Sequence, residues 1–433
     1  MRRTSIVSTG LANPWLAVAQ ALDYRKLPAG PSAILAALHL TDPRYEALAR
    51  LDDAQWLEAL AFSDKWQLTL SLRRVAGEFL PAWVRERMDE NAAHNRERHR
   101  RLEVLYRRIA GALEGIEFVA LKGLAHCRDF GSLPEDRTQC DVDLYIPGDL
   151  VYAARDAILA LGYESMKEME PFPTDHLPTL ILKSGWQWRG DHFDPDIPLG
   201  IELHFQFWND RVERLPVPDA AGFWTRRVTR TIAGTHFSVL CEMDALAYAS
   251  LHLLKHVLQG SVRPFHVYEV ARFLDSRADS PAFWRQWRVE HSPELRRLEA
   301  VIFRLATAWF GGAANSAVDE EIAQLPAATR AWFDEFALSP ASGLFRSNKD
   351  ELWLHLSLLK SRRDAWSVTK RRLLPERLPG PVDAVYIPDS QMRWSRRMLK
   401  RLRWARHVTS RLRHHSAALP RLLLSGVRWR RAC

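Results

Sequence analysis

The hydrophobic pattern of this 433-residue chain changes near Gly115 and changes back near residue 210. Up to Gly115 apolar residues recur every three or four positions, as in "RERHRRLEVLYRRIAGAL", and this spacing indicates amphipathic helices. From there to residue 210 the apolar runs are short, and glycine and proline separate them, as is typical of strands and turns. Helical spacing then returns. We therefore expect an α+β fold, with a small mixed sheet embedded between an N-terminal and a C-terminal helical region.

The middle of the chain alternates between predicted strands and helices. In order, we expect a strand in "IEFVAL", a short helix in "GLAHCRDF", a strand in "DVDLYI" and a helix in "LVYAARDAILAL". Asp149 is placed to cap this second helix and Gly162 to end it. Further strands are predicted in "TLILKSGWQW" and "GIELHFQFW". The changes of pattern divide the chain into four predicted parts: helical region 1–115, α/β core 116–210, helical region 211–380 and basic tail 381–433.

The composition is that of a folded protein of the reducing cytoplasm. Hydrophobic residues make up 47% of the chain and charged residues 26%, which argues against a disordered chain. The four cysteines form no CxxC pair, so we expect free thiols and neither a disulfide framework nor a zinc ribbon. We find no clear signal peptide, and no run of roughly 18 apolar residues that would span a membrane. We therefore expect a cytoplasmic protein.

Positive charge is concentrated toward the C-terminal end. The net charge is +9, yet 13 of the 61 lysines and arginines follow Asp389 and no acidic residue does, which leaves 48 basic against 52 acidic residues elsewhere. Trp394, Met398 and Leu402 follow helical spacing among these basic residues. A basic amphipathic helix within 390–433 suits an anionic membrane surface, at the inner face of the membrane, or the phosphates of RNA. The remaining option is a helix that packs on the mildly acidic body.

Two aspartates lie one residue apart in the apolar run "DVDLYI". Residues i and i+2 of a strand share a face, so Asp141 and Asp143 are expected to project side by side. Two carboxylates this close repel unless a cation neutralises them, and removing one should then relieve strain. Mg²⁺ takes carboxylate oxygens and commonly shares itself with substrate phosphates, and Mn²⁺ is the alternative ion. The competing interpretation is a solvated edge strand with two surface acids.

Glu202 is the candidate for a third acid. It is the one acidic residue on the polar face of the strand predicted in "GIELHFQFW". A two-metal phosphoryl-transfer site often needs one more carboxylate, for the ion that activates the attacking hydroxyl. We therefore assign Glu202 a predicted metal-binding and catalytic role beside Asp141 and Asp143, with a salt bridge as the alternative.

A lysine and a glycine precede the first short helix of the core. Gly123 would let the backbone approach a phosphate, and the helix that begins there would present free N–H groups. Lys122 offers a point charge for triphosphate oxygens, and Arg137 offers a planar fork. We therefore predict nucleotide binding by Lys122, Gly123 and Arg137, with ordinary ion pairing as the alternative for the two cations.

Taken in order, "FVALKGLAHCRDF", "EDRTQCDVDLYI" and "GIELHFQFW" resemble the polymerase-β-type nucleotidyltransferase superfamily. The likeness is strongest to a poorly characterised bacterial branch with an LKG turn, an arginine before the DxD and a later acid, and it covers roughly residues 50 to 275. It implies a minimal nucleotidyltransferase core and Mg²⁺ held by Asp141, Asp143 and Glu202. It also implies transfer of a nucleotidyl group from an NTP such as ATP to a hydroxyl of an acceptor. Glu269 stands where the branch favours aspartate.

Two other functions remain open from the sequence. In a glycosyltransferase a DxD holds a metal on a nucleotide-sugar diphosphate, although helices, and not a strand-helix nucleotide half, precede this DxD. A non-catalytic module of the same fold would bind nucleotide or a partner without turnover. Leu124 favours that module, because the superfamily usually has serine after the glycine of the turn and the hydroxyl is missing here.

Overall fold

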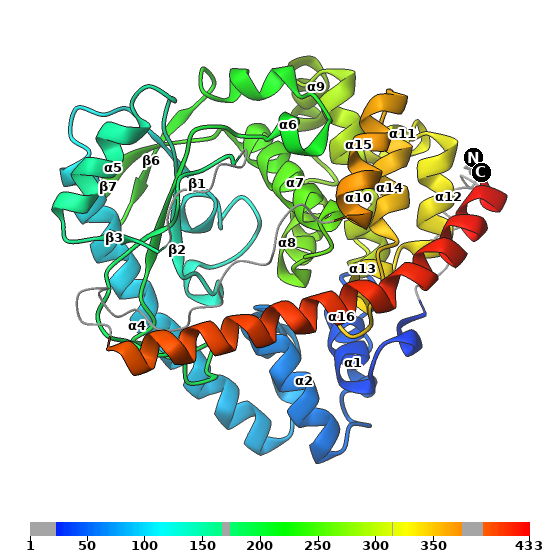
Figure 1. Cartoon of the computed structure of the whole chain (residues 1–433), viewed down its shortest axis with the longest axis horizontal. Helices are drawn as coiled ribbons and strands as arrows, with labels where there is room; N and C mark the ends of the chain where they lie inside the picture. The colour runs from blue at the N-terminus through cyan, green and yellow to red at the C-terminus, as the bar shows by residue number, and fades with distance from the viewer. Residues whose placement is uncertain (1–22, 167–173, 314, 375–392) are drawn as a thin grey trace, which may run out of the picture.

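The computed structural model describes residues 23–166, 174–313, 315–374 and 393–433. Within these ranges a seven-stranded mixed sheet is flanked by helical regions, which confirms the predicted α+β class (Figure 1). The helical prediction for residues before 23 and the tail between 381 and 392 lie outside the described residues. From one edge to the other the strands are β3 (Glu164–Ser165), β4 (Leu180–Ile181), β5 (Gly200–His204), β2 (Asp141–Tyr145), β1 (Val119–Leu121), β7 (Thr235–Val239) and β6 (Val228–Ile232).

The three central strands give the sheet two different faces. Strand β2 runs parallel to β5 and antiparallel to β1. Because side chains alternate along a strand, Val142 and Leu144 of β2 point to one face, where they share a hydrophobic core with helices α4 (Ala82–Ala112) and α5 (Val151–Ala160). Val119 and Leu121 of β1 belong to the larger core on the other face, with the helices that follow the sheet. The aspartates of β2 alternate with Val142 and Leu144, so they lie on this second face.

Local sequence explains the helices that precede the sheet. Asp52 and Gln55 form a reciprocal capping box at the start of the second of these helices, and each side chain bonds the other's backbone N–H. In the last of them, Leu102, Leu105 and Ile109 are buried at three- and four-residue spacing, so this stripe faces the sheet. The four helices are α1 (Ala29–Ala37), α2 (Asp53–Lys65), α3 (Thr69–Ala76) and α4.

A β-hairpin, β6–β7, extends the sheet beyond the predicted core. Ala233 and Gly234 connect its strands and both have positive φ, at +53° and +80°, as a tight two-residue hairpin turn requires. Strand β7 pairs in parallel with β1, so the hairpin completes one side of the sheet. The expectation of mostly helical chain after residue 210 was therefore wrong for 228–239, and the sheet continues past the predicted boundary at 210.

Two details of the predicted core were also wrong. The run "GLAHCRDF" forms a single 3-10 turn, Gly123–Ala125, and not a short helix that continues to Phe130. Helix α5 begins at Val151 after Leu150, and no side-chain cap from Asp149 is present. Strands β1, β2, β4 and β5 lie within the four runs predicted as strands, and all are shorter than those runs. The two-residue strand β3 was not predicted.

The helices that follow the sheet form most of the larger core. Helices α7 and α8 lie on the face of the sheet that carries Asp141 and Asp143, and α10 packs on both helices. The helices in this region are α6 (Asp210–Glu213), α7 (Glu242–Leu258), α8 (Pro264–Ser276), α9 (Pro281–Glu290), α10 (Pro293–Phe310), α11 (Ser316–Ala323), α12 (Ala327–Phe336), α13 (Ser339–Ser342), α14 (Glu351–Leu358) and α15 (Arg362–Leu373).

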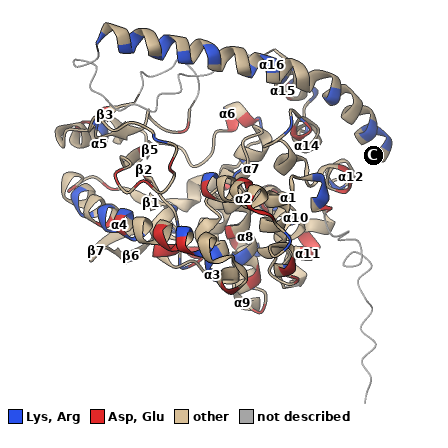
Figure 2. Cartoon of the chain, turned by 90° about the horizontal axis from the view of Figure 1, so that it is seen from below, with Lys and Arg blue, Asp and Glu red and all other residues tan. Residues whose placement is uncertain are grey.

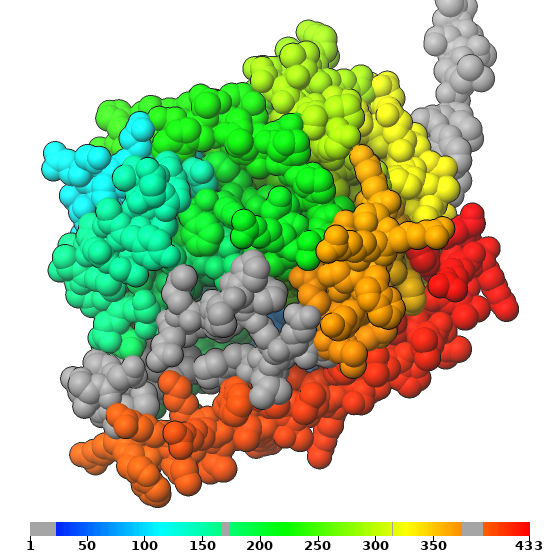
Figure 3. All heavy atoms as spheres, turned by 45° about the horizontal axis from the view of Figure 1, so that its top comes forward, coloured from blue at the N-terminus to red at the C-terminus, as the bar shows by residue number. Residues whose placement is uncertain are grey.

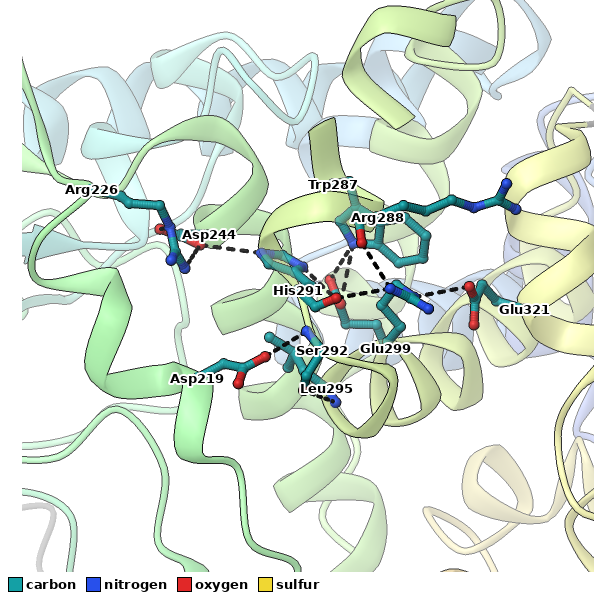
Figure 4. Close-up of polar contacts among 11 residues, drawn as sticks. Asp219, Arg226, Asp244, Trp287, Arg288, His291, Ser292, Leu295, Glu299 and Glu321 are labelled. Carbon is teal, nitrogen blue, oxygen red and sulfur yellow. Dashed lines mark hydrogen bonds and ion pairs between the residues drawn. The ribbon is translucent and has the colours of Figure 1, made fainter. Parts of the chain in front are cut away.

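A buried group of charged side chains ties α7, α9 and α10 together (Figure 4). His291, directly after α9, contacts Asp244 of α7 at 3.2 Å and Glu299 of α10 at 3.0 Å, and all three side chains are fully buried. Arg226 forms a two-point ion pair with Asp244, and the indole of Trp287 donates to Glu299. Burial alone would lower the pKa of His291, but the two carboxylates outweigh it and raise the pKa to about 9.

The predicted tail helix is present as α16 (Trp394–Ala432). It runs along one edge of the molecule as a single long rod (Figure 3). Over its last part it packs against α12, α14 and α15. Within the described residues, no helix combines the length and the apolar character needed to cross a membrane.

Candidate active site

The strand register brings the predicted carboxylates together. In the parallel pair of β2 and β5, Asp143 lies opposite Glu202, and Asp141 lies opposite Gly200. All three acids are on the face of the sheet turned toward α7 and α8, because β2 and β5 both alternate with period two. Asp143 is only 2% exposed, so its charge needs a partner within the protein or a bound ion.

Asp143 already has two cationic or donor partners. The Nζ of Lys122 lies 2.9 Å from Asp143 Oδ1, and Nε2 of His204 lies 3.1 Å from the same oxygen. Burial would raise the pKa of Asp143, but Lys122 and His204 outweigh it and hold the pKa well below its usual range. Burial likewise opposes the charge of Lys122, yet the nearby carboxylates raise its pKa. In the free chain the ammonium group of Lys122 therefore neutralises Asp143, a role that the sequence predicted for a metal ion.

Asp141 is compensated only in part, because the charges of Lys122 and Arg263 lower its pKa less than its surroundings raise it. Burial raises its pKa to about 6, and the negative charges of Asp143 and Glu202 act in the same direction. The repulsion expected between the two aspartates is therefore present, and it falls on Asp141. A proton or an additional cation near Asp141 would relieve it.

A group of potential metal ligands forms at the same place. Ligand-type atoms of Asp143, Glu202 and His204 all lie within 4.8 Å of one another, and Nε2 of His204 is 3.8 Å from Glu202 Oε2. The hydroxyl of Thr179 donates to Glu202 Oε1 at 2.9 Å and so orients this carboxylate. Thr179 was not singled out from the sequence, and its only sequence signal is a hydroxyl residue at the start of a predicted strand.

The turn after β1 positions Lys122 and requires glycine next to it. Lys122 and Gly123 both have positive φ, at +51° and +55°. A Cβ atom on Gly123 would overlap the side-chain amide of Gln139, so this position has room only for glycine. Gln139 accepts from the N–H of Leu124 at 3.2 Å and donates to the carbonyl of Asp141 at 2.5 Å. The turn is thereby joined to β2.

Gln139 also changes the expected phosphate cradle. The prediction placed several free N–H groups at the start of a helix, but the single 3-10 turn offers fewer, and the N–H of Leu124 is occupied. Gln139 is 3% exposed, and its role was not predicted from the sequence. The sequence signal is a glutamine two positions before the DxD.

Arg137 is engaged with another part of the protein. Its guanidinium forms a two-point ion pair with Glu269 of α8, at 2.8 and 3.3 Å, and both side chains are largely buried. Glu269 was noticed in the sequence only as a departure from the family pattern and was not paired with Arg137. The structure thus favours ordinary ion pairing for Arg137 in the free chain, and phosphate contact by Arg137 stays a prediction.

A pocket of about 380 Å³, open solvent at its mouth included, lies beside the carboxylates. The turn after β1 forms one wall, and α7 and α8 form the opposite wall. Lys122 links the two places, because it lines the pocket and also contacts Asp143. Among the side chains that line the pocket are Lys122, Arg137, Tyr248, His252, His266 and Glu269.

The histidines of α7 and α8 are neutral neighbours of Lys122. Nε2 of His252 lies 3.3 Å from the Nζ of Lys122 and 3.3 Å from Nε2 of His256. Burial, with further help from the charge of Lys122, lowers the pKa of His252 well below its usual value, and burial does the same for His266. His252 and His266 both line the pocket.

The comparisons with known proteins bear on the same part of the chain. A model of the family described as "Uncharacterised nucleotidyltransferase" matches residues 53–311. This span holds the whole sheet, the carboxylate cluster, the pocket and helices α7 and α8. A search of curated proteins and a search of solved structures each found no match. The match covers more than half of the chain, so the chain belongs to this nucleotidyltransferase family.

Proposed function

We propose that the chain transfers a nucleotidyl group from an NTP to a hydroxyl of an acceptor molecule. The observation that carries this proposal is the register of β2 on β5, which sets Asp143 opposite Glu202 on the face that also holds Asp141. Membership of the family supports nucleotidyl transfer in general. The order of LKG turn, DxD and third acid, on adjacent strands of one mixed sheet, supports the closer resemblance to the polymerase-β-type superfamily.

The carboxylates fit a hard divalent cation. Asp141, Asp143 and Glu202 offer the oxygen ligands that Mg²⁺ and Mn²⁺ prefer. The raised pKa of Asp141 shows that a bound cation would be favourable next to this carboxylate. We assign the three acids to such an ion, with His204 as a hydrogen-bond partner that fixes Asp143. When bound, the ion would neutralise triphosphate charge and lower the pKa of the acceptor hydroxyl.

The residues of the chain have separate tasks in this reaction. The acceptor oxygen forms a bond to the α-phosphorus, the bond from that phosphorus to the β-bridging oxygen breaks, and pyrophosphate leaves. Glu202, held by Thr179, accepts the hydroxyl proton. Lys122 contacts the triphosphate, which requires its Nζ to move away from Asp143, where it lies in the free chain.

Transfer of label from α-labelled NTPs tests the proposal. The protein is incubated with each labelled NTP, Mg²⁺ and a host extract, and labelled products and pyrophosphate are measured. Asp143→Asn is expected to lower transfer about a thousandfold, and Glu202→Gln to lower it similarly while leaving NTP affinity nearly unchanged. Asp149→Asn is the matched control, because Asp149 is an exposed acid just after β2. Full activity of Asp143→Asn would place the metal site elsewhere, and release of a nucleoside diphosphate would indicate a glycosyltransferase.

A non-catalytic nucleotide-binding module is the second candidate. Two observations favour it: the amide of Leu124 is occupied by Gln139, and the guanidinium of Arg137 is paired with Glu269. Both reduce the number of groups that are free to hold a triphosphate. NTP binding without label transfer or pyrophosphate release in any acceptor screen would favour the module over the enzyme.

A further inference from the structure

Helix α16 has one face that is fixed against the body. Near its C-terminal end, Ala418, Leu422, Ser425 and Gly426 are buried. The indole of Trp353 donates to Ser425 Oγ at 2.9 Å. A Cβ atom on Gly426 would overlap the ring of Trp353, so glycine permits this close approach. These contacts set the rotation of the helix about its own axis, and therefore also determine which of its residues point away from the body.

An apolar stripe runs along the exposed side of α16. At about 100° per residue, six large apolar side chains fall on one stripe, centred roughly 130° around the axis from the docked residues. All six are exposed, between 45% and 75%. They are Trp394, Met398, Leu402, Leu412, Leu423 and Val427. Single exposed apolar residues need no explanation, but a stripe along a 39-residue helix does.

Positive charge borders this stripe. Arg401, Arg406 and Arg413 lie at its edges by the same helical geometry, and all three are exposed. Figure 2 shows basic segments along α16 and no acidic ones, in keeping with the absence of any acidic residue after Asp389. The exposed side of the helix thus carries an apolar stripe with cationic margins.

We propose that α16 lies on the surface of an anionic lipid bilayer, with the stripe in the boundary between headgroups and acyl chains. Helices that lie in this interface combine an apolar face with basic margins and an interfacial aromatic residue. Here the arginine stems extend along the apolar surface while their guanidinium groups reach lipid phosphates. A rod of about 58 Å would lie flat on the bilayer. The absence of a spanning helix among the described residues agrees with a helix that does not cross.

Other occupants fit this surface less well. Along the apolar stripe, the phosphates of RNA would meet leucine, methionine and tryptophan, where positive charge is needed. A second copy of the chain would bring together two α16 helices, each with 12 basic residues and no acidic residue, and like charges would oppose that contact. A bilayer with anionic headgroups satisfies both the apolar stripe and the basic margins.

Vesicle co-sedimentation of the full chain, without nucleotide, tests the proposal independently of the proposed catalytic activity. The protein is expected to bind vesicles of phosphatidylcholine that contain phosphatidylglycerol. Leu402→Asp with Leu423→Asp is expected to weaken binding at least tenfold. Val289→Asp is the matched control, because Val289 on α9 is 82% exposed, and this variant should bind like the parent protein.

A second pair of variants separates the charge contribution. Arg406→Gln with Arg413→Gln should weaken binding to anionic vesicles about 25-fold, at about fivefold per arginine, and leave binding to pure phosphatidylcholine unchanged. Circular dichroism verifies that each variant folds. The proposal is overturned if the parent protein does not bind anionic vesicles, or if the leucine variant binds as well as the parent. It is equally overturned if the chain binds a single-stranded RNA oligonucleotide and not vesicles.

Discussion

Lys122 is expected to stabilise the free protein by neutralising the carboxylate cluster, and its removal should be costly. In the free chain its Nζ lies 2.9 Å from Asp143, with side-chain exposures of 15% and 3%. The negative charges of Asp141 and Glu202 act on the same ammonium group. Lys122→Met would leave three carboxylates on one face of the sheet without this cation.

The expected magnitude follows from the burial of the pair. Removing one partner of a buried ion pair costs about 3 to 5 kcal/mol, a large part of the roughly 5 to 15 kcal/mol that stabilise a native protein. Asp143→Asn should lower the unfolding free energy less, by about 1 to 3 kcal/mol. In this variant the ammonium of Lys122 still has the carboxylates of Asp141 and Glu202 nearby. From the sequence alone, two close aspartates predicted relief of strain on removing one. The ammonium of Lys122 reverses that expectation for Asp143.

A double-mutant cycle in urea, followed by tryptophan fluorescence, measures this coupling. The double variant Lys122→Met/Asp143→Asn should be about 1 to 3 kcal/mol more stable than the sum of the single effects predicts. Mg²⁺ should stabilise Lys122→Met more than the parent protein, since the acids then have no other cation. Lys360→Met with Glu294→Gln is the matched control. Its side chains are 76% and 54% exposed, so we expect coupling below about 1 kcal/mol.

The reasoning is refuted by a small coupling. If the Lys122–Asp143 cycle gives no more than the exposed Lys360–Glu294 cycle, the ammonium does not neutralise Asp143 in solution. An unchanged stability of Lys122→Met would lead to the same conclusion. Either result would leave Lys122 free for the triphosphate without any movement.

Two further predictions concern buried groups elsewhere in the fold. His291 has a pKa raised from 6.5 to about 9, so its charged form stabilises the protein fully below pH 6.5, and this contribution is lost as the pH rises through 9. His291→Gln should lower the unfolding free energy by about 3 kcal/mol at pH 7 and make it less dependent on pH between 7 and 10. Urea titrations at several pH values measure both effects, and parallel pH profiles for parent and variant would contradict the prediction. Gly123→Ala should destabilise by about 1 to 3 kcal/mol, because the residue has positive φ and its Cβ would overlap Gln139. Gly148→Ala is its control in thermal unfolding, since a Cβ there meets nothing within 4 Å, and equal melting temperatures for the two variants would contradict the steric argument.

Local patterns in the sequence were sufficient to predict the elements and the faces of the strands. Period-two alternation placed Asp141 and Asp143 on one face, and helical spacing predicted both flanking helical regions and α16. These properties depend on residues within one or two turns of each other, so the sequence determines them directly. The hairpin β6–β7 was missed because its first strand, "VTRTI", is largely exposed and has little apolar alternation. Its pairing with the sheet depends on contacts with β1, more than 100 residues earlier.

Only the tertiary structure decided which charges meet. Lys122 and Arg137 were both predicted to bind phosphate, yet the fold places Lys122 on Asp143 and pairs Arg137 with Glu269, 132 positions away. Likewise, the spacing in α16 predicted an amphipathic helix, but the packing of Trp353 on Gly426 decided which face is buried. The physical reason is the same in each case. A charged group can pair with any of several oppositely charged groups, and an apolar face can pack on any of several apolar surfaces. The long-range packing of helices and strands selects one of them, because it alone determines which groups are buried together and must compensate one another.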